Sequence, residues 1–436
     1  MTHEKMNFTF RGANLLKKIE IKARNINNIS YFCIVKRFKS ILRPLFAMML
    51  LVFASSMNVH AYMTMTQKYE QHIDSTIYLG LLTCQPSQEV YSLYGHTAIH
   101  YVNRDQGIDV AINYGMFSFS KPYFVLRFVL GLTDYEMGVQ PFDLFCMSYA
   151  AEQRGITEQI LNIPALEKIK IAEAIERNYL PENREYRYNY FYDNCTTRAR
   201  DMVLGSLKKY IKYKRQDGGP SFRRMIHAYN EEHPWARFGN DMLLGIKADL
   251  PTNINEQQFL PDHLMEDFST AIVNKDNKEW KLVNETKAII PYFQQNVAKE
   301  FPVRPITCSI ILLIITVILT FIERSLKISI WYYDLLLLVL SGLSGLILFV
   351  MIFSQHPTVS LNLQLLMFNP LPLFFAWRAV KRIRLHQYDC WWKIWGILII
   401  LFFIGAFFQC YAEGMILVAC SLLLRCSIHI FGTNNK

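Results

Sequence analysis

The sequence predicts an exported α+β domain followed by an α-helical transmembrane bundle, and three observations support this fold class. The first is composition, because 52% of the 436 residues are hydrophobic and only 19% are charged, which is too apolar for one soluble domain. The second is a short apolar run behind a basic leader, and the third is a series of apolar runs after residue 300. Strand and helix patterns alternate between these two ends, as in a folded domain.

Residues 1–61 are predicted to form a basic leader and a signal peptide. The apolar run 45–54 is too short to cross a bilayer and follows a positively charged stretch, which is typical of a signal peptide. Val59 and Ala61 place small residues at the −3 and −1 positions of a cleavage site, so we expect cleavage after Ala61. An uncleaved signal anchor is the alternative, and both outcomes export the segment that follows.

The formal charge of +10 does not indicate a nucleic-acid partner, because the leader supplies most of it. Residues 1–44 carry ten Lys and Arg against two Glu, which leaves 36 basic and 34 acidic side chains in the other 392 residues. Nucleic-acid binding depends on a basic surface that neutralises phosphates, and the body of this chain is nearly neutral. We therefore predict no nucleic-acid partner.

Residues 301–436 are predicted to form a membrane domain of about five helices, because apolar runs there approach the roughly 20 residues that span a bilayer. The runs are 306–322, 335–353, 359–377, 394–412 and 415–431. The third run contains Asn362, Gln364 and an Asn-Pro-Leu-Pro sequence, which predict a broken or re-entrant helix. The fifth run is short and carries Arg425.

The distribution of Lys and Arg predicts how this bundle is oriented. Arg324 and Lys327 follow the first run, and five further basic residues follow the third between 378 and 393, whereas the loops 354–358 and 412–414 have none. Loops rich in Lys and Arg stay in the cytoplasm. The segment before the first run is therefore on the outer side of the membrane, in agreement with the signal peptide.

The exported segment, residues 62–300, is long enough at about 240 residues to bury a core without disulfides. We expect a hairpin with a turn over Asn103–Gly107, and an aromatic helix or loop over 122–131. The strands and helices expected around these features are a strand at 76–83, hairpin strands at 97–102 and 109–114, and helices at 167–178 and 196–209.

Cys195 is the candidate nucleophile of the exported domain. The domain has three cysteines, Cys84, Cys146 and Cys195, so at least one thiol stays outside any internal disulfide. Cys195 falls at the N-terminus of a predicted helix, where the helix dipole favours the thiolate and the backbone N–H can face an oxyanion. Asp193 and Asn194 are also ordinary N-cap residues, which explains the local sequence without chemistry.

A thiol nucleophile needs a base, and His96 has the most suggestive context of the histidines in this domain. Gly95 precedes it and permits a close approach of backbone or substrate. Asn113 on the second hairpin strand lies within reach, and we expect it to orient the imidazole through Nδ1. His100 is the reserve base. The alternative is that His96 is simply a polar residue at the end of a sheet.

No metal or cofactor is predicted for the exported domain. HExxH, CxxC and His-x-His spacings do not occur in residues 62–300, and the His96/His100 and His227/His233 pairs lack carboxylate or thiol ligands at zinc-site spacing. The sequence also has no GxSxG motif, and no phosphate-binding loop follows Gly218-Gly219-Pro220. The chemistry that remains is that of a cysteine nucleophile.

Three motifs together resemble the circularly permuted branch of the papain-like (NlpC/P60-type) cysteine enzymes, which includes the lecithin retinol acyltransferase family. The motifs are Tyr94-Gly95-His96-Thr97-Ala98-Ile99, Ile112-Asn113-Tyr114-Gly115 and Phe191-Tyr192-Asp193-Asn194-Cys195-Thr196-Thr197-Arg198. Ordinary papain-like enzymes have the order Cys, His, polar residue, whereas this chain has His, polar residue, Cys. The polar residue is often His in those families and is Asn113 here.

Residues 72–268 more closely resemble the periplasmic domain of the Lnb family of bacterial lipoprotein N-acyltransferases. This resemblance also includes Leu82-Thr83-Cys84, Pro181-Glu182-Asn183-Arg184, Pro234-Trp235 and Phe259-Leu260-Pro261. It implies a multi-pass protein of the bacterial inner membrane, with its catalytic domain in the periplasm. The implied reaction transfers an acyl chain from a phospholipid to the α-amino group of the lipid-modified N-terminal cysteine of a lipoprotein.

In that reaction Cys195, His96 and Asn113 would be catalytic, and Arg198, Asn194 and Tyr94 would bind substrate. Arg198 would hold a lipid phosphate, although a plain surface salt bridge is the alternative. The aromatic run Tyr123, Phe124 and Phe128 would enter lipid or line an acyl channel, with core packing as its alternative.

Two other functions stay open. A membrane-tethered cysteine peptidase or amidase acting on cell-wall peptide would use the same Cys-His pair, but one membrane anchor would suffice for it. A non-enzymatic binding domain would have Cys195 buried away from His96, so the relation between these two side chains separates the alternatives.

Overall fold

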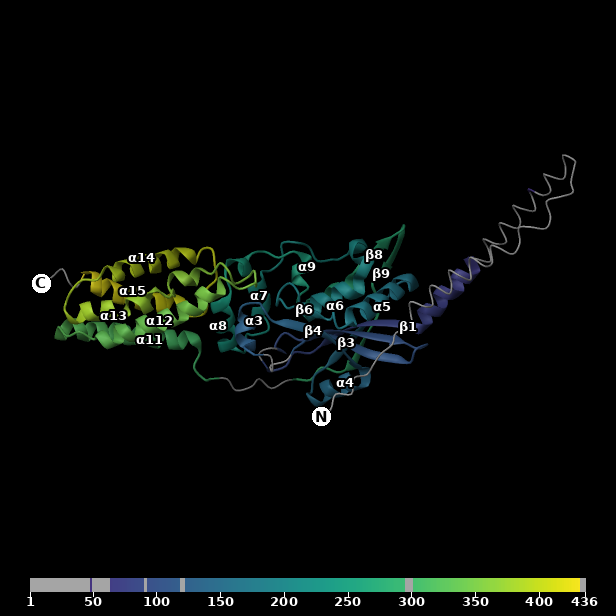
Figure 1. Ribbon diagram of the computed structural model, residues 1–436, viewed down its shortest axis with the longest axis horizontal. Helices are drawn as coiled ribbons and strands as arrows, with labels where there is room; N and C mark the ends of the chain where they lie inside the picture. The colour runs from purple at the N-terminus through teal and green to yellow at the C-terminus, as the bar shows by residue number, and fades with distance from the viewer. Residues whose placement is uncertain (1–47, 49–62, 90–91, 118–121, 295–300, 432–436) are drawn as a thin grey trace.

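The computed structural model describes residues 48, 63–89, 92–117, 122–294 and 301–431. In this part of the chain a sheet domain is followed by a region of long helices, and the two are arranged end to end (Figure 1). The predicted signal peptide and its cleavage after Ala61 lie outside the described residues.

The sheet domain is built on a seven-stranded sheet in the order β10-β5-β1-β2-β3-β4-β6, with antiparallel neighbours throughout. Its strands are β1 (Ile77–Cys84), β2 (His96–Asn103), β3 (Ile108–Met116), β4 (Asp134–Pro141), β5 (Ile156–Leu161), β6 (Glu185–Arg187) and β10 (Val283–Ile290). The predicted hairpin is confirmed, because β2 and β3 pair with Ala98 opposite Asn113.

Helices cover both faces of this sheet. Successive side chains along its strands point to opposite faces, and buried side chains lie on both. Leu81 and Ile99 face the main core, to which α5 (Ala165–Tyr179) and α6 (Cys195–Leu204) contribute. Leu82 and Ala98 face a smaller cluster under α4 (Phe142–Ala151). All four side chains are fully buried. The two-sided burial fixes the register of β1 and β2, since a one-residue slip would exchange the two faces.

The helix that begins at Cys195 is shorter than expected. The prediction placed a helix over 196–209, but α6 ends at Leu204. Gly205 has a φ of 46°, which an α-helix does not tolerate, and the chain continues as the 3₁₀-helix η2 (Gly205–Tyr210). The other predicted helix, over 167–178, is confirmed by α5, and residues 124–129 of the aromatic run form α3 (Phe124–Val129).

A second, three-stranded sheet and several short helices complete the sheet domain. The sheet has the order β7 (Ile211–Lys212), β8 (Ile272–Lys275), β9 (Lys278–Lys281). The helical segments are α7 (Phe222–His227), α8 (Pro234–Leu243), η3 (Ile246–Asp249), α9 (Ile254–Gln257) and α10 (Pro261–Thr270). Of these, α7 and α8 lie at the end of the domain nearest the helical region (Figure 1).

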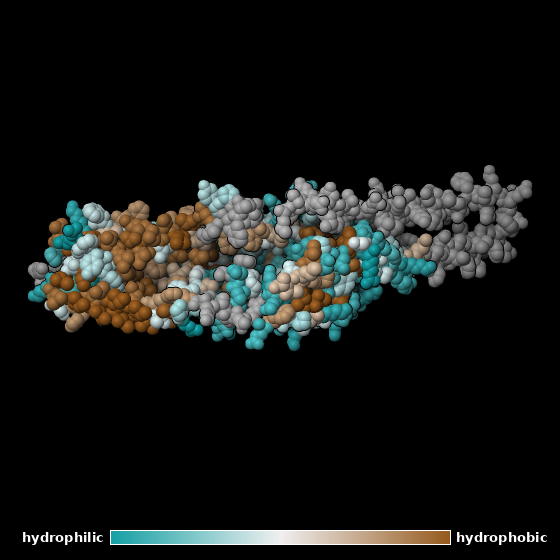
Figure 2. Space-filling view, turned by 90° about the horizontal axis from the view of Figure 1, so that it is seen from below, coloured by the Kyte–Doolittle hydropathy of each residue, from teal (hydrophilic) through white to brown (hydrophobic). Residues whose placement is uncertain are grey.

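The helical region contains α11 (Pro305–Leu326), α12 (Trp331–Met351), α13 (Leu371–Arg384), α14 (Cys390–Gly405) and α15 (Met415–Phe431). Within the described residues, α11 and α12 are long and apolar enough to cross a membrane, and α14 and α15 are shorter apolar helices. Hydrophobic residues cover most of this region in the space-filling view, whereas hydrophilic residues are frequent on the sheet domain (Figure 2).

The run 359–377 is not one helix, as its polar residues and prolines predicted. Residues 363–366 form the 3₁₀-helix η4 (Leu363–Leu366), and α13 begins only at Leu371. The cause is long-range hydrogen bonding. The Asn362 and Gln364 side-chain amides both donate to the Met242 carbonyl at the end of α8, at 2.8 and 3.1 Å. The run 394–412 also ends early, because α14 stops at Gly405.

Arg425, the charged residue of the fifth run, is buried inside the bundle among acidic partners. Its guanidinium donates two hydrogen bonds of 2.7 Å to Asp334 on α12 and one of 2.6 Å to Glu323 on α11. His429 lies 2.9 Å from the same Asp334. A charge in an apolar bundle requires such partners, and this network joins α11, α12 and α15.

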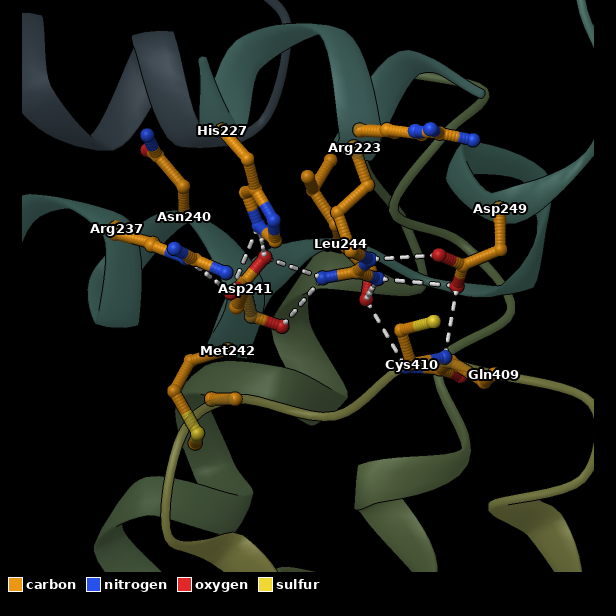
Figure 3. Close-up of polar contacts among 12 residues, drawn as sticks. Arg223, His227, Arg237, Asn240, Asp241, Met242, Leu244, Asp249, Gln409 and Cys410 are labelled. Carbon is orange, nitrogen blue, oxygen red and sulfur yellow. Dashed lines mark hydrogen bonds and ion pairs between the residues drawn. The ribbon is translucent and has the colours of Figure 1, made fainter. Parts of the chain in front are cut away.

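The sheet domain and the helical region are joined by a second buried ionic network (Figure 3). Arg223 on α7 donates to Asp241 at 2.7 Å and to Asp249 at 2.8 Å, and its side chain is 2% exposed. Asp249 also accepts from the Cys410 backbone N–H at 3.1 Å, in the loop between α14 and α15. Gln409 in the same loop donates to the Leu244 carbonyl at 3.0 Å. These bonds attach the loop directly to the sheet domain.

Candidate active site at the start of helix α6

The local sequence before Cys195 starts α6 at that residue. The Asn194 side-chain oxygen accepts from the backbone N–H groups of Thr196 and Thr197, both at 2.9 Å. The Thr197 hydroxyl accepts from the Asn194 backbone N–H at 2.9 Å, which completes a capping box. The Asn194 amide donates to the Tyr190 and Phe259 carbonyls. Asn194 therefore has the ordinary N-cap role, and Cys195 is held at the first helical position.

The start of β2 brings His96 to this helix end. His96 is the first residue of the strand, and both His96 and Cys195 are half-buried. The two side chains lie close enough for the charge of each to shift the pKa of the other. Gly95, just before His96, packs closely on the neighbouring strand, because it has a φ of 76° and a side chain there would lie 2.8 Å from the Cys84 carbonyl. The geometry expected of a non-enzymatic domain, with Cys195 away from His96, is not observed.

Asn113 contacts the imidazole from the neighbouring strand, but at a different nitrogen than expected. Its side-chain oxygen lies 3.1 Å from His96 Nε2, whereas the prediction used Nδ1. A carboxamide oxygen only accepts, so Nε2 carries a proton and Nδ1 is the nitrogen left to exchange a proton with the thiol. The expectation was wrong because ring orientation depends on the side-chain torsion angles at the strand end, which spacing along the chain does not determine.

The electrostatics of the pair favour a thiolate and an imidazolium. Burial alone would raise the pKa of Cys195, but the charge of His96 and hydrogen bonds from His96, Thr97 and Thr196 outweigh it and lower the pKa to about 7. Burial alone would lower the pKa of His96, but the Cys195 charge and the bonds to Cys195 and Asn113 raise it. The shifts are opposite in direction, as expected for an ion pair near neutral pH.

Two threonines next to the pair were missed by sequence reasoning. The backbone of Thr97 contributes to the lowered pKa of Cys195. The Thr97 hydroxyl donates to the Thr196 hydroxyl at 3.1 Å, and the Thr196 hydroxyl lies 3.8 Å from the sulfur, within reach of a weak hydrogen bond. Both residues immediately follow a predicted catalytic residue in the chain, and that adjacency is the signal that could have identified them.

Gly115 and Tyr186 line the other side of the thiol. Gly115 has a φ of 89°, and a Cβ on it would lie 3.7 Å from the Cys195 Cβ and 4.0 Å from the Tyr186 hydroxyl. Any larger residue at position 115 would therefore narrow the space in front of the sulfur. The motif Ile112-Asn113-Tyr114-Gly115 contained this glycine, but only the fold shows why it is needed.

Comparison with protein families is consistent with this geometry. Residues 65–229 match the model of the Lnb N-terminal periplasmic domain, and residues 296–436 match the model of the Lnb transmembrane domain. The chain belongs to the Lnb family. No curated protein and no solved structure matches it. Membership of the Lnb family identifies a membrane-embedded lipoprotein-modifying acyltransferase with a periplasmic domain and a transmembrane domain.

The predicted substrate residues of this Lnb-family chain have protein partners. Arg198 donates to both carboxylate oxygens of Asp193, at 2.6 and 2.7 Å, and its guanidinium lies 3.7 Å from the centre of the Tyr186 ring. The Tyr94 hydroxyl accepts from Asn240 on α8 at 2.8 Å. Binding of a lipid phosphate by Arg198 stays a prediction, and the salt bridge considered as its alternative is present.

The reserve base and the metal prediction concern other parts of the Lnb periplasmic domain. His100 is bound between Glu158 at 2.6 Å and Asp109 at 2.9 Å and stacks on Phe142, so it is engaged away from Cys195. Among the residues that the structure describes, no group of three or more His, Cys, Asp and Glu side chains is placed to hold a metal ion. The absence of a catalytic metal stays a prediction.

The loop that precedes Cys195 shares a hydrophobic cluster with residues of the transmembrane domain of this Lnb-family chain. Phe191 belongs to a buried hydrophobic cluster with Phe222 and Phe259 of the sheet domain and with Met351 and Val359 of the helical region. Four residues after Phe191, helix α6 begins at Cys195. The segment that precedes the thiol therefore belongs to a hydrophobic cluster that extends to the end of the helical region.

Proposed function

We propose that this protein transfers an acyl chain from a phospholipid, through a thioester on Cys195, to the α-amino group of the lipid-modified N-terminal cysteine of a lipoprotein. The observation that carries the proposal is the Cys195-His96-Asn113 arrangement, held against a transmembrane domain in a chain of the Lnb family. Both substrates have acyl chains in the bilayer, so a nucleophile next to the bundle is suited to both. No nucleic acid and no cofactor take part.

The first half of the reaction is an acyl transfer to sulfur. The Cys195 thiolate attacks the ester carbonyl of the phospholipid, and the Cys195 backbone N–H, which has no acceptor within the described part of the chain, donates to the developing oxyanion. The ester C–O bond then breaks. His96 donates its Nδ1 proton to the departing oxygen, so a lysophospholipid alcohol leaves and a thioester remains.

The second half transfers the acyl chain to nitrogen. His96 is now neutral, and its Nδ1 accepts a proton from the incoming α-amino group as that nitrogen attacks the thioester carbonyl. The C–S bond breaks, which forms the amide and returns Cys195 to its thiolate beside an imidazolium. Asn113 holds the ring by accepting from Nε2 in both halves. Low water access at the membrane side favours attack by the amine over hydrolysis.

We further propose a circularly permuted papain-like fold for residues 62–300, a bundle of about five membrane helices for residues 301–436, and a multi-pass location in the inner membrane. The order of the elements supports the fold, since the strands with His96 and Asn113 precede the helix with Cys195. Within this fold Asn194 and Tyr94 are positioning residues, because Asn194 caps the helix of the nucleophile and Tyr94 links the His96 strand to α8.

The hydrophobic cluster that contains Phe191, Met351 and Val359 favours the transferase over the cell-wall peptidase. A wall hydrolase would have to present its thiol to a substrate outside the bilayer, and a single anchor would serve it. The Tyr94 hydroxyl also accepts from Asn240 on α8, and Phe238 of the same helix packs against the core of the helical region.

The proposal is tested by mass spectrometry of the N-terminal peptide of a reporter lipoprotein. Wild type, Cys195→Ala and His96→Ala are compared in cells, with the membrane abundance of each variant measured. We expect an N-acylated peptide with the wild type and a free-amine, diacylated peptide with both variants. Unchanged acylation in variants that insert at normal abundance would overturn the proposal, and release of cell-wall peptides by the wild type would support the peptidase.

A further inference from the structure

A groove lies where helix α8 of the sheet domain meets the first turns of α11 and α15. It measures about 170 Å³ and is lined mainly by apolar side chains, namely Trp235, Phe238, Cys308, Leu312, Met415 and Val418. Apolar cavities of about 150 Å³ take up small hydrocarbons in other proteins. This groove therefore has room for a segment of an aliphatic chain.

Close packing at one end and hydrogen bonds around the rim give the groove its apolar character. Gly414 has a φ of 84° and packs directly on Ser309 and Ile306, which no larger residue would allow. The Ser309 hydroxyl donates to the Pro305 carbonyl at 3.0 Å, and the Trp235 indole donates to the Val303 carbonyl at 2.9 Å. The polar groups at the groove are therefore satisfied within the protein.

Exposed apolar side chains flank the groove residues on both membrane helices. On α11, Ile310 and Ile311 are exposed beside the groove residues, and on α15 Ile416 is exposed between Met415 and Val418. These side chains belong to the transmembrane domain of the family model, where the surroundings are hydrocarbon. An apolar groove that opens onto such a surface is exposed to the acyl chains of bilayer lipids at very high local concentration.

We propose that this groove binds one acyl chain of a membrane glycerophospholipid and thereby holds the acyl donor next to the active site. The inference rests on the proposed function for the use of that lipid. Its link to the site is α8, because Trp235 and Phe238 line the groove while Asn240 on the same helix donates to Tyr94, two residues before His96. In Figure 1, α8 lies between the bundle and the sheet domain.

The test is photo-crosslinking in native membranes with the full-length chain carrying Cys195→Ser, which removes turnover. The probe is a phosphatidylethanolamine with a diazirine in one acyl chain, and labelled peptides are mapped by mass spectrometry. We expect labels on residues 305–312 and 415–418. Val418→Trp fills the groove and should lower this labelling roughly tenfold. Ile416→Trp, about half a helical turn away at an exposed position, should leave it unchanged.

Equal labelling of both variants, or labelling spread evenly over the lipid-facing surface, would overturn the proposal that the groove binds an acyl chain. The proposal would also be overturned if only a diacylated lipopeptide carrying the same diazirine labelled the groove, since the groove would then bind the lipoprotein acceptor. Crosslinking to the groove does not depend on acyl transfer. If the groove is labelled but the wild-type protein transfers no acyl chain, only the proposed function is refuted. Transfer by the wild type without groove labelling would refute the groove alone.

Discussion

Cys195 and Cys84 approach the same histidine from two regions of the periplasmic domain, and their thiols behave in opposite ways. Cys84 ends strand β1 and is the register partner of His96 across the β1–β2 pair. Cys195 begins helix α6. Both are free thiols, yet the pKa of Cys84 is raised to about 12 and the pKa of Cys195 is lowered to about 7.

The difference comes from what each sulfur contacts. Cys84 is 1% exposed in the apolar cluster under α4, and burial raises its pKa far more than its bond to Tyr149 lowers it. Cys146 on α4 follows the same pattern, since burial and nearby carboxylates raise its pKa to about 11. Cys195 is also desolvated, but the charge of the His96 imidazole lowers its pKa instead. Direct contact with a base therefore decides which thiol is activated.

The largest expected effect tests this comparison directly. Cys195→Ala should abolish acyl transfer, a loss of at least ~10³-fold, because no other group can form the thioester. Cys84→Ala should retain activity and lose only stability, by about 1 kcal/mol, for the small cavity left behind. The measurement is the N-acylated fraction of a reporter lipoprotein at matched membrane abundance.

If Cys84→Ala were as inactive as Cys195→Ala while remaining folded, the pKa contrast would not identify the nucleophile. A second readout separates the two thiols without mutation, because iodoacetamide at pH 7.5 should alkylate Cys195 and leave Cys84 unmodified.

His96→Gln should have the next largest effect on acyl transfer, since it removes the base. Glutamine keeps a side chain of similar length. We expect transfer to fall by about 10² to 10⁴-fold. In the wild type the alkylation rate of Cys195 should rise with pH through about 7, because the thiolate forms above its pKa. Without the imidazole charge, burial raises that pKa, so the profile should move to higher pH.

The control for this variant is Cys84, which should stay protected from alkylation while the domain is folded, because unfolding would also return the pKa of Cys195 to its ordinary, higher value. A profile that stays centred near pH 7 in His96→Gln would mean that the helix N-terminus and the two threonines, not His96, activate the thiol.

Asn113 tests whether orientation of the ring matters once the base is present. Asn113→Leu removes the acceptor for Nε2 and should lower transfer by about 10 to 10²-fold, with the half-maximal phospholipid concentration unchanged. Asn113→His offers a ring nitrogen as acceptor and should recover much of the activity. An equal loss in both variants would indicate a packing role for Asn113, which is 7% exposed.

Sequence reasoning predicted which residues meet, because the signals for their meeting are local. A glycine before His96, an N-cap before Cys195 and a hairpin turn between the His96 and Asn113 strands all act within a few residues. The ring nitrogen that faces Asn113 was predicted incorrectly, because it depends on torsion angles set by packing at the end of the sheet.

In the membrane domain, too, sequence reasoning failed where contacts between distant segments determine the structure. Hydropathy identified the apolar runs, but the chain over 359–370 leaves the helical conformation to hydrogen-bond with Met242, which is more than a hundred residues away. Arg425 likewise looked unfavourable in an apolar run until Asp334 and Glu323, from two other helices, were seen to surround it. Contacts between distant segments, which periodicity does not encode, explain both cases.

The smallest expected effect concerns Arg198, where the salt bridge and the phosphate-binding role make different predictions. Arg198→Gln removes a partly exposed ion pair with Asp193, worth about 0 to 1 kcal/mol of stability. If the pairing is purely structural, the phospholipid dependence of transfer should match that of Asp193→Asn, which breaks the same pair and keeps the arginine. If Arg198 binds phosphate, Arg198→Gln should raise the half-maximal phospholipid concentration and Asp193→Asn should lower it, because the freed guanidinium is then available to the lipid.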